Sequence, residues 1–315
     1  MTVHLVYPAD PDRIAAPWSI GNNVSAGLRA AGYDVEQYDW EDTAVITPDD
    51  GDILLGHPHP IRGHTFCASL SGPWAKKIVM TPINIQGENL EFALSVIACC
   101  DHFIAIGGPG WGHLPAEHGI DYKTTVIDLA VEPKDFPIRK LRFNQPGERK
   151  FLFIGCIVPF KNAGFLSQLA AKTGYDFRHI GFGDIPNVLN YGYAHLEDHQ
   201  NQDAVGHHDF LITPSVFDAN PTTVLECGMI GLVSMCSPFC GWREDVTGIF
   251  PLDLDRAAEC MEALQFADEG LLLGEPMRSG RPSRRSIHGD ASWSRCALYC
   301  RNPDVQSARE VEEGH

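Results

Sequence analysis

The sequence has 315 residues, of which 44% are apolar and 21% charged, an ordinary composition for a globular protein. At this length, two domains of about 150 residues each are the natural expectation. Asp and Glu outnumber Lys and Arg by 41 to 24, which gives a formal charge of −17. Because that charge repels a phosphate backbone, we expect no nucleic-acid partner.

Neither a membrane span nor a leader is expected. The sequence has no apolar run long enough to cross a bilayer. Its first residues lack the basic and then apolar pattern of a secretory signal. Ten cysteines in 315 residues are too dilute for a disulfide scaffold, which favours a reducing compartment. We therefore expect a cytoplasmic protein.

The first half of the chain alternates short apolar strands with helical segments. A loop is expected over 9–18, and the spacing of Val24, Leu28 and Ala31 predicts a helix that begins at Val24. Such alternation is typical of a parallel sheet covered by helices on both faces. The expected strands are 3–7, 35–38, 52–56, 77–81, 102–106 and 124–128, and a second helix is expected at 90–100.

A second strand-helix series follows residues 132–150, which are rich in proline and basic residues and resemble a linker. Its expected strands are 151–155, 177–181, 209–213 and 232–236, and its expected helices are 163–172, 221–230 and 256–266. A last helix is expected near 293–301. We therefore predict a first domain over 1–140, a linker over 141–150, a second domain over 151–290, and a C-terminal helix and tail over 291–315.

The segment 208–236 carries the most specific pattern, since it reads as strand, loop, helix and strand. Asn220 is a good N-cap, and Pro221 suits the first helical position. The N–H groups of Thr222 and Thr223 would then point outward at the positive end of the helix dipole. The sequence therefore predicts an anion site at this helix end.

Two carboxylates flank that predicted anion site. Asp218 precedes the cap, and Glu226 lies one turn into the helix, on the same face as Thr222. A carboxylate beside an anion costs Coulomb energy unless it accepts hydrogen bonds from hydroxyl groups. A sugar attached to a phosphate would meet both demands.

This segment resembles the carboxylate motif of retaining glycosyltransferases with the GT-B fold, especially family 4 (group 1). Their pattern is a strand, Pro-Ser, an acidic residue, seven further residues, a Glu, a helix, and then Gly-(Leu/Ile)-Pro-Val. Here it runs from Pro214-Ser215 through Asp218 and Glu226 to Gly231-Leu232-Val233. The resemblance implies an α/β protein of two Rossmann-like domains with a cleft between them, the acceptor on the first domain and the donor on the second. It also implies that the C-terminal helix crosses back to the first domain.

Weaker matches extend the resemblance over nearly the whole chain. Gly155 followed by Lys161 is similar to the family's phosphate-binding strand and lysine. Gly181 to Gly183 looks like its glycine turn near the nucleotide, and Asp52 to His59 like its acceptor-side Asp-to-His-x-His segment. Gly21 stands where a first-strand loop touches the donor diphosphate, and Trp293 fits a common C-terminal Ser-Trp.

The resemblance implies metal-independent transfer of a sugar, with retention, from a UDP- or GDP-sugar to a glycan, lipid-linked or small-molecule acceptor. Such reactions build polysaccharides, and they need no cofactor besides the donor. Lys161 would stabilise the diphosphate, Asp218 would hold the transferred sugar, and Glu226 would hold the ribose. The implied catalytic residues are Asp218, Glu226, Lys161, His57 and His59, and the implied donor-binding residues are Gly21, Gly155, Lys161, Gly183, Asn220, Thr222, Thr223 and Glu226.

Two departures from the family pattern leave alternatives open. Asp218 stands where the family usually has Glu, and Cys156 stands where it usually has Arg; Arg178 and Arg243 are candidate substitutes. A catalytically weakened nucleotide-sugar-binding protein and a nucleotide-sugar epimerase of the same fold are the alternatives. A basic run over 278–285 leaves open a peripheral contact with the inner face of a membrane.

Overall fold

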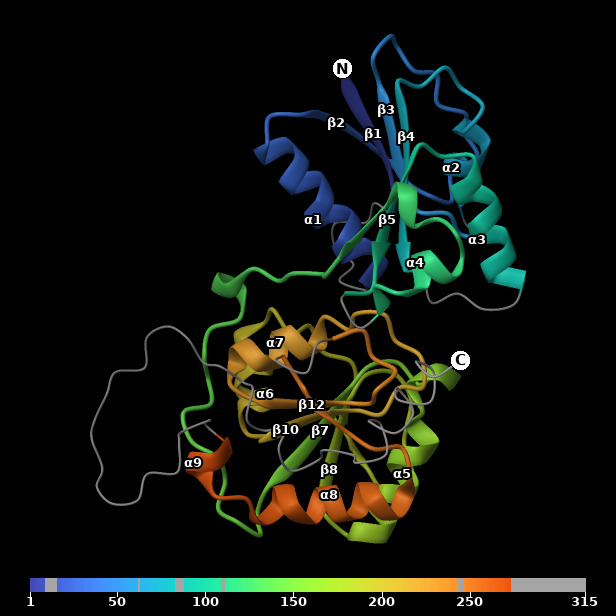
Figure 1. Ribbon diagram of the computed structural model, residues 1–315. Coiled ribbons are helices and arrows are strands. Elements are labelled where there is room, and N and C mark those ends of the chain that lie inside the picture. Colours follow the sequence, from blue (N-terminus) through green and yellow to red (C-terminus); the bar gives the residue numbers. More distant parts are fainter. Residues whose placement is uncertain (9–15, 62, 83–87, 109–110, 243–245, 273–315) are drawn as a thin grey trace. The chain divides into compact units, whose positions relative to one another are not determined.

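The computed structural model describes residues 1–8, 16–61, 63–82, 88–108, 111–242 and 246–272. The chain divides into two compact units, the first over Met1–Leu129 and the second from Ala130 onward. Each unit contains one parallel sheet of six strands covered by helices (Figure 1). The predicted α/β architecture of two sheet domains is confirmed. The predicted helix near 293–301 and the tail lie outside the described residues, as does Trp293.

The first unit has the spatial strand order β2-β1-β3-β4-β5-β6. Its strands are β1 (Thr2–Val6), β2 (Asp34–Tyr38), β3 (Ile53–Gly56), β4 (Lys76–Pro82), β5 (His102–Ile106) and β6 (Thr124–Ile127). Its helices are α1 (Ala16–Ala30), α2 (His64–Ser69), α3 (Glu88–Ala98) and α4 (Leu114–Glu117). Figure 1 shows α1 on one side of this sheet and α2 and α3 on the other. That arrangement follows when right-handed crossovers run both ways from β1. It explains why residues 3–6 of β1 are all buried, since both faces of the strand are covered.

The second unit has the order β12-β11-β10-β7-β8-β9. Its strands are β7 (Lys150–Ile154), β8 (Asp176–Ile180), β9 (Leu189–Asn190), β10 (Phe210–Thr213), β11 (Val233–Cys236) and β12 (Gly248–Ile249). Its helices are α5 (Ala163–Thr173), α6 (His199–Gly206), α7 (Thr223–Ile230), α8 (Leu254–Phe266) and α9 (Glu269–Leu272).

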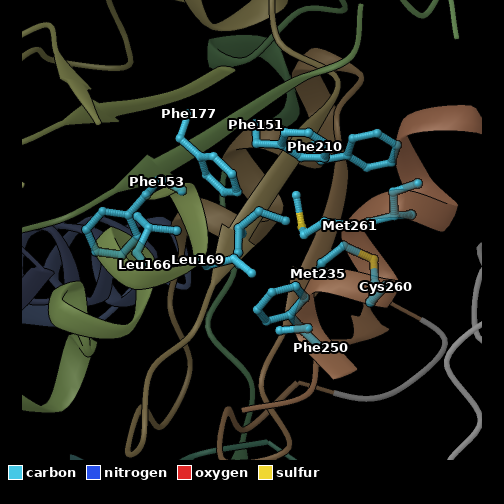
Figure 2. Packing of buried hydrophobic residues seen from close by; sticks show 14 of the residues in the cluster. Phe151, Phe153, Leu166, Leu169, Phe177, Phe210, Met235, Phe250, Cys260 and Met261 are labelled. Carbon is cyan, nitrogen blue, oxygen red and sulfur yellow. The ribbon is translucent and has the colours of Figure 1, made fainter. Parts of the chain in front are cut away.

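Alternate residues of each central strand feed two separate cores in the second unit. Phe151 and Phe153 of β7 point to the face covered by α5 and α8, where they pack with Leu166 and Met261 (Figure 2). Leu152, between them, points to the opposite face, covered by α6 and α7. The strand alternation of period 2 thus supplies both cores from one apolar run.

The segment predicted as a linker, 141–150, belongs to the second unit. Phe143 lies in the core beneath α5 and α8, and Lys150 already begins β7. The buried carboxylate of Asp209 pairs with Lys140 at 2.9 Å and with Arg149 at 3.8 Å. The prediction of a free linker is therefore wrong. Two basic side chains of this region, those of Lys140 and Arg149, thus pair with a buried carboxylate rather than facing solvent.

The end of α7 fixes the same segment. The carbonyl of Ile230 accepts hydrogen bonds from the N–H groups of Arg139 and Lys140, both at 2.9 Å. Gly231 ends the helix in the left-handed region, with φ of 112°, and a Cβ there would lie 2.7 Å from the carbonyl oxygen of Lys140. Glycine is required at this position for both reasons. The boundary between the units therefore follows Leu129 and precedes the predicted end of the first domain at 140.

Helix α1 begins earlier than its aliphatic spacing predicts. Trp18, Gly21 and Ser25 form its buried face, a helical spacing that a search for aliphatic residues overlooks. A Cβ on Gly21 would lie 2.7 Å from the Cβ of Tyr7, so glycine allows α1 to approach the end of β1. The predicted loop around Gly21 is therefore wrong, and this residue packs a helix against a strand.

Each sheet has one point where its strand order reverses. In the first sheet this point lies between β1 and β3, and in the second it lies between β7 and β10. Loops that leave the carboxyl ends of the two strands at such a point diverge, and open α/β sheets bind ligands in the opening. The loops after β7 and β10 thus form the natural ligand edge of the second unit, and those after β1 and β3 form that of the first.

Candidate functional site

An ion pair lies at the reversal point of the second sheet. Lys161 ends the short helical turn Pro159–Lys161 after β7, and Asp218 lies in the loop after β10. The Lys161 ammonium pairs with the Asp218 carboxylate, and the two side chains are 19% and 13% exposed. The hydroxyl of Ser215 lies 3.4 Å from the same carboxylate oxygen. Two predicted site residues, 57 positions apart in the sequence, are therefore in direct contact.

Backbone hydrogen bonds hold the two loops together. The N–H of Val216 donates to the carbonyl of Phe160 at 2.8 Å, and the side-chain amide of Asn162 donates to the carbonyl of Pro214 at 3.2 Å. On its other side, the Asp218 N–H donates to the carbonyl of Phe239 at 3.2 Å. The ion pair is thus built on a fixed frame, which limits the rearrangement needed to meet a ligand.

The helix that follows this loop begins later than predicted. Thr222 is the N-cap of α7, so Asn220 and Pro221 precede the helix rather than cap it. The Pro221 carbonyl accepts a hydrogen bond from the Trp242 indole at 2.9 Å, and that contact holds the entry into the helix. In the described part of the chain, no acceptor faces the N–H groups of Thr222 and Thr223. These donors lie at the positive end of the helix, as an anion site requires.

Glu226 lies one turn into α7 and is half-buried. Burial raises its pKa to about 7, because the charged carboxylate loses solvent. The Thr222 hydroxyl donates to this carboxylate and opposes the rise, while the nearby charge of Glu197 adds to it. Sequence patterns gave no signal for Glu197, which lies in the loop before α6. The site therefore holds a carboxyl group that changes charge near neutral pH.

This pKa predicts a dependence of stability on pH. The pKa of Glu226 in the folded state lies above its pKa in the unfolded chain. Its contribution to the free energy of unfolding is therefore fully present below about pH 4.5 and is lost as the pH rises through about 7. Replacing Glu226 with Gln should stabilise the protein at pH 8 by about 1–3 kcal/mol and have little effect at pH 5. Melting temperatures across this pH range measure the difference. Glu259→Gln, on the exposed face of α8, is the matched control. An equal effect of Glu226→Gln at both pH values would contradict the assignment.

Gly155 and Gly183 lie beside the ion pair's loop. A Cβ on Gly155, which has φ of 151°, would lie 3.9 Å from the Cε of Lys161. Gly183 has φ of 92°, and a Cβ there would lie 2.8 Å from the side chain of Ile157, two residues after Gly155. Both predicted glycines therefore lie in the loops after β7 and β8, where they leave the backbone uncovered by a side chain of their own.

Cys156 stands where the family 4 pattern usually has an arginine, and Arg178 and Arg243 are the candidate substitutes for that arginine. Of these two, the one that the structure describes does not fill the role. Arg178 makes a bidentate ion pair with Asp176, with one hydrogen bond of 2.8 Å. Its guanidinium also stands over the ring of Tyr191, 5.8 Å from the centroid. Arg178 is therefore engaged at the start of β8, and Arg243 lies outside the described residues.

In the first unit, His57 and His59 follow β3 at that sheet's reversal point. The His57 ring lies 5.4 Å from the ring of Tyr7 and 5.5 Å from that of Trp40, and the His59 ring lies 5.0 Å from Trp40. Burial lowers the pKa of His57 to about 4, so its imidazole is neutral at physiological pH. The sequence did not indicate that Tyr7 and Trp40 lie beside these histidines, because Tyr7 follows β1 and Trp40 lies in a separate loop.

Comparisons with known proteins rest on structure. No family model matches the chain, and no curated protein matches it in sequence. AviGT4, a glycosyltransferase involved in avilamycin A biosynthesis, has a similar structure with a TM-score of 0.53 at 14% identity, over 99% of this chain and 96% of that one. An E. coli structure described as trehalose-6-phosphate bound with UDP-2-fluoro glucose has a TM-score of 0.63 at 9% identity, over 86% and 92%. The chain has the GT-B fold.

A third similar structure matches 99% of this chain and 98% of its own, with a TM-score of 0.55 at 10% identity. It is an α-glucosyltransferase in complex with UDP and a 13-mer DNA. At these identities the likeness concerns the fold. No helix in the described residues is long and apolar enough to span a bilayer.

Proposed function

We propose that this protein is a retaining glycosyltransferase, similar to family 4, that moves a sugar from a UDP- or GDP-sugar to an acceptor without a metal ion. The observation that carries the proposal is the Lys161–Asp218 pair at the reversal point of the second sheet. It is followed by N–H groups at the start of α7 that have no acceptor among the described residues. One cation and two donors suit a diphosphate, and the carboxylates suit the hydroxyl groups of its sugars.

Each residue then has a distinct part in the proposal. Lys161 breaks its ion pair with Asp218 and neutralises the negative charge of the departing diphosphate. The Thr222 and Thr223 N–H groups assist it. Asp218, once released, accepts hydrogen bonds from the transferred sugar. Glu226, charged above about pH 7, accepts those of the ribose. His57, which is neutral at physiological pH, or His59 contacts the sugar near its reacting carbon.

UDP occurs in two of the similar GT-B structures, one of which holds UDP-2-fluoro glucose. This supports a uridine donor as the first to test. The acceptor is proposed to be a glycan, a lipid-linked sugar or a small molecule, in the cytoplasm or at the inner face of a membrane. With a formal charge of −17, this chain is not proposed to bind nucleic acid.

A catalytically weakened nucleotide-sugar-binding protein is the second candidate. Two observations favour it: Lys161 is closed in an ion pair, and Cys156 supplies no guanidinium. Nucleotide binding without sugar release would support this candidate, and release would exclude it.

A binding panel tests the proposal. Melting temperatures are measured with UDP, GDP, ADP and their sugar conjugates at about 100 times the dissociation constant. A ligand of the folded state should stabilise by about 2.7 kcal/mol, or several degrees. A shift with one nucleotide family identifies the base, and release of sugar from that donor then tests turnover. No shift with any nucleotide would contradict both candidates.

A further inference from the structure

His179 is a fully buried histidine beneath the loop that leaves β7. It lies in β8 and pairs in register with Phe153 of β7, and the two rings are stacked with centroids 5.4 Å apart. Neither the family resemblance nor the spacing of polar residues points to this position. A buried polar ring is costly unless its nitrogens are used, so each nitrogen needs an explanation.

The ring makes one hydrogen bond. Its Nε2 lies 2.8 Å from the carbonyl oxygen of Gly155. Since a carbonyl only accepts, Nε2 carries the hydrogen and donates it. The other nitrogen, Nδ1, is buried and faces no hydrogen-bonding atom in the described part of the chain. Nε2 is therefore the nitrogen that holds the Gly155 carbonyl inward.

Holding this carbonyl fixes the direction of the next N–H group. In a trans peptide, the C=O of one residue and the N–H of the next point in opposite directions, and none of the described peptide bonds is cis. The Cys156 N–H is thus directed away from the buried ring. Cys156 is exposed, and its N–H has no partner within the described ranges.

The surroundings prevent the peptide from turning over. The carbonyl oxygen of Gly155 lies against the Cα of Gly181, where a Cβ would collide with it and would lie 2.6 Å from His179 Nε2. The N–H of Gly155 donates to the carbonyl of Ile180 at 3.0 Å. Only glycine at position 181 leaves room for both the ring and the carbonyl.

We propose that His179 is a positioning residue for the donor diphosphate: by holding the Gly155 carbonyl, it aims the Cys156 N–H at the phosphate oxygens beside Lys161. The inference rests on the proposed function and deepens it. It also supplies a donor at the position where family 4 usually has an arginine, because a backbone N–H there does not depend on the side chain that Cys156 lacks. The group recognised is a diphosphate, and the base and sugar play no part.

Two variants of His179 test this role. His179→Phe keeps a ring in the core but removes the donor, and His179→Gln returns an N–H at a similar reach. His208→Phe is the matched control, because His208 is also buried in the second unit but bonds to the carbonyl of Ala204 at 3.0 Å, in α6. Dissociation constants are measured by calorimetry for UDP and uridine, and for GDP and guanosine.

We expect His179→Phe to weaken binding of the diphosphate about 10- to 100-fold while leaving the nucleoside within about twofold. His179→Gln should recover most of the loss, and His208→Phe should bind both ligands like the wild type. Equal weakening of nucleotide and nucleoside, or full affinity in His179→Phe, would overturn the inference. A wild type that binds none of the four ligands would instead overturn the proposed function.

A second measurement does not depend on the stability of a variant. In the wild-type protein, the Cys156 amide proton should move downfield in NMR spectra when inorganic pyrophosphate is added, since it gains a charged acceptor. The Gly174 amide, already bonded to the Ala170 carbonyl at 2.9 Å, is the internal reference. A Cys156 amide that stays in place under saturating pyrophosphate would contradict the proposed direction of its N–H.

Discussion

Replacing Lys161 with Met is expected to lower the rate of sugar transfer at least about 100-fold, with the fold retained. A preorganised donor aimed at charge that develops in the transition state contributes on the order of 100- to 1,000-fold. Lys161 is the one described lysine that pairs with the predicted sugar-binding carboxylate, and it stands on a turn fixed to the neighbouring loop. Initial rates across donor concentrations give kcat and KM, and the loss should appear in kcat.

A matched lysine provides the control. Lys172 also pairs with an aspartate, Asp255, but the two side chains are 41% and 79% exposed and lie on α5 and α8, away from the loops after β7 and β10. Lys172→Met should therefore transfer sugar like the wild type. Full turnover in Lys161→Met would show that this lysine is not part of the catalytic machinery.

The partner of Lys161 separates the two candidate functions. In a transferase, Asp218→Asn should bind nucleotide as well as or better than the wild type, because the lysine is released, but should transfer sugar slowly. In a weakened binding protein, Asp218→Asn raises the affinity for nucleotide, and neither the wild type nor the variant transfers sugar. Binding and turnover measured on one preparation distinguish these outcomes.

Replacing Asp209 with Ala is expected to destabilise the second unit by about 3–5 kcal/mol. Its carboxylate accepts hydrogen bonds from the N–H groups of Asn144 and Lys150, both at 2.8 Å, and pairs with Lys140 and Arg149. Its removal leaves buried cations and donors without an acceptor, which costs more than the pair itself contributes.

Scanning calorimetry measures this effect. The transition of the second unit should move down by about 10 °C, while that of the first unit stays in place. Asp255→Ala, which removes an exposed carboxylate, should change the transition by no more than about 1 kcal/mol. Equal effects of the two changes would show that the Asp209 cluster does not hold the segment before β7.

The Asp209 carboxylate also makes the stability of the protein depend on pH in the acidic range. Burial alone would raise the pKa of Asp209, but the donors from Lys150, Asn144 and Lys140 outweigh it and hold the pKa below its usual value. The stabilisation is therefore present above the unfolded pKa of about 3.9 and is lost as the pH falls through the folded value.

Most strands of both sheets could be predicted from the sequence, because they are short runs rich in apolar residues that end at glycine, proline or a polar residue. That signal is local, so the parallel α/β fold follows from it. The two-residue edge strands β9 and β12 were not predicted. The start of α1 was missed because its buried face uses Trp18, Gly21 and Ser25 rather than aliphatic side chains. Here packing against Tyr7 decides the structure, and the pattern of aliphatic residues does not report it.

The segment before β7 was misjudged for a different reason. In the sequence, Lys140 and Arg149 look like solvated linker residues. In the fold they pair with Asp209, which lies 60 or more positions away in the sequence. No local pattern carries that information. The site shows the same division: the Asp218 and Glu226 motif lies in one segment and was visible, whereas the contact of Asp218 with Lys161 depends on β7 and β10 being neighbours. The functional role of the site stays a prediction.

The attachment of residues 130–149 to the second unit also determines where this chain can be recombined. A chimaera that exchanges the second sheet at residue 150 would separate Lys140, Asn144 and Arg149 from Asp209 and leave Gly231 facing a foreign carbonyl. A crossover between Leu129 and Ala130 keeps every one of these contacts within one parent. The natural crossover point for exchanging the second unit between chains of this fold therefore lies just after the first sheet, about twenty residues before the second sheet begins.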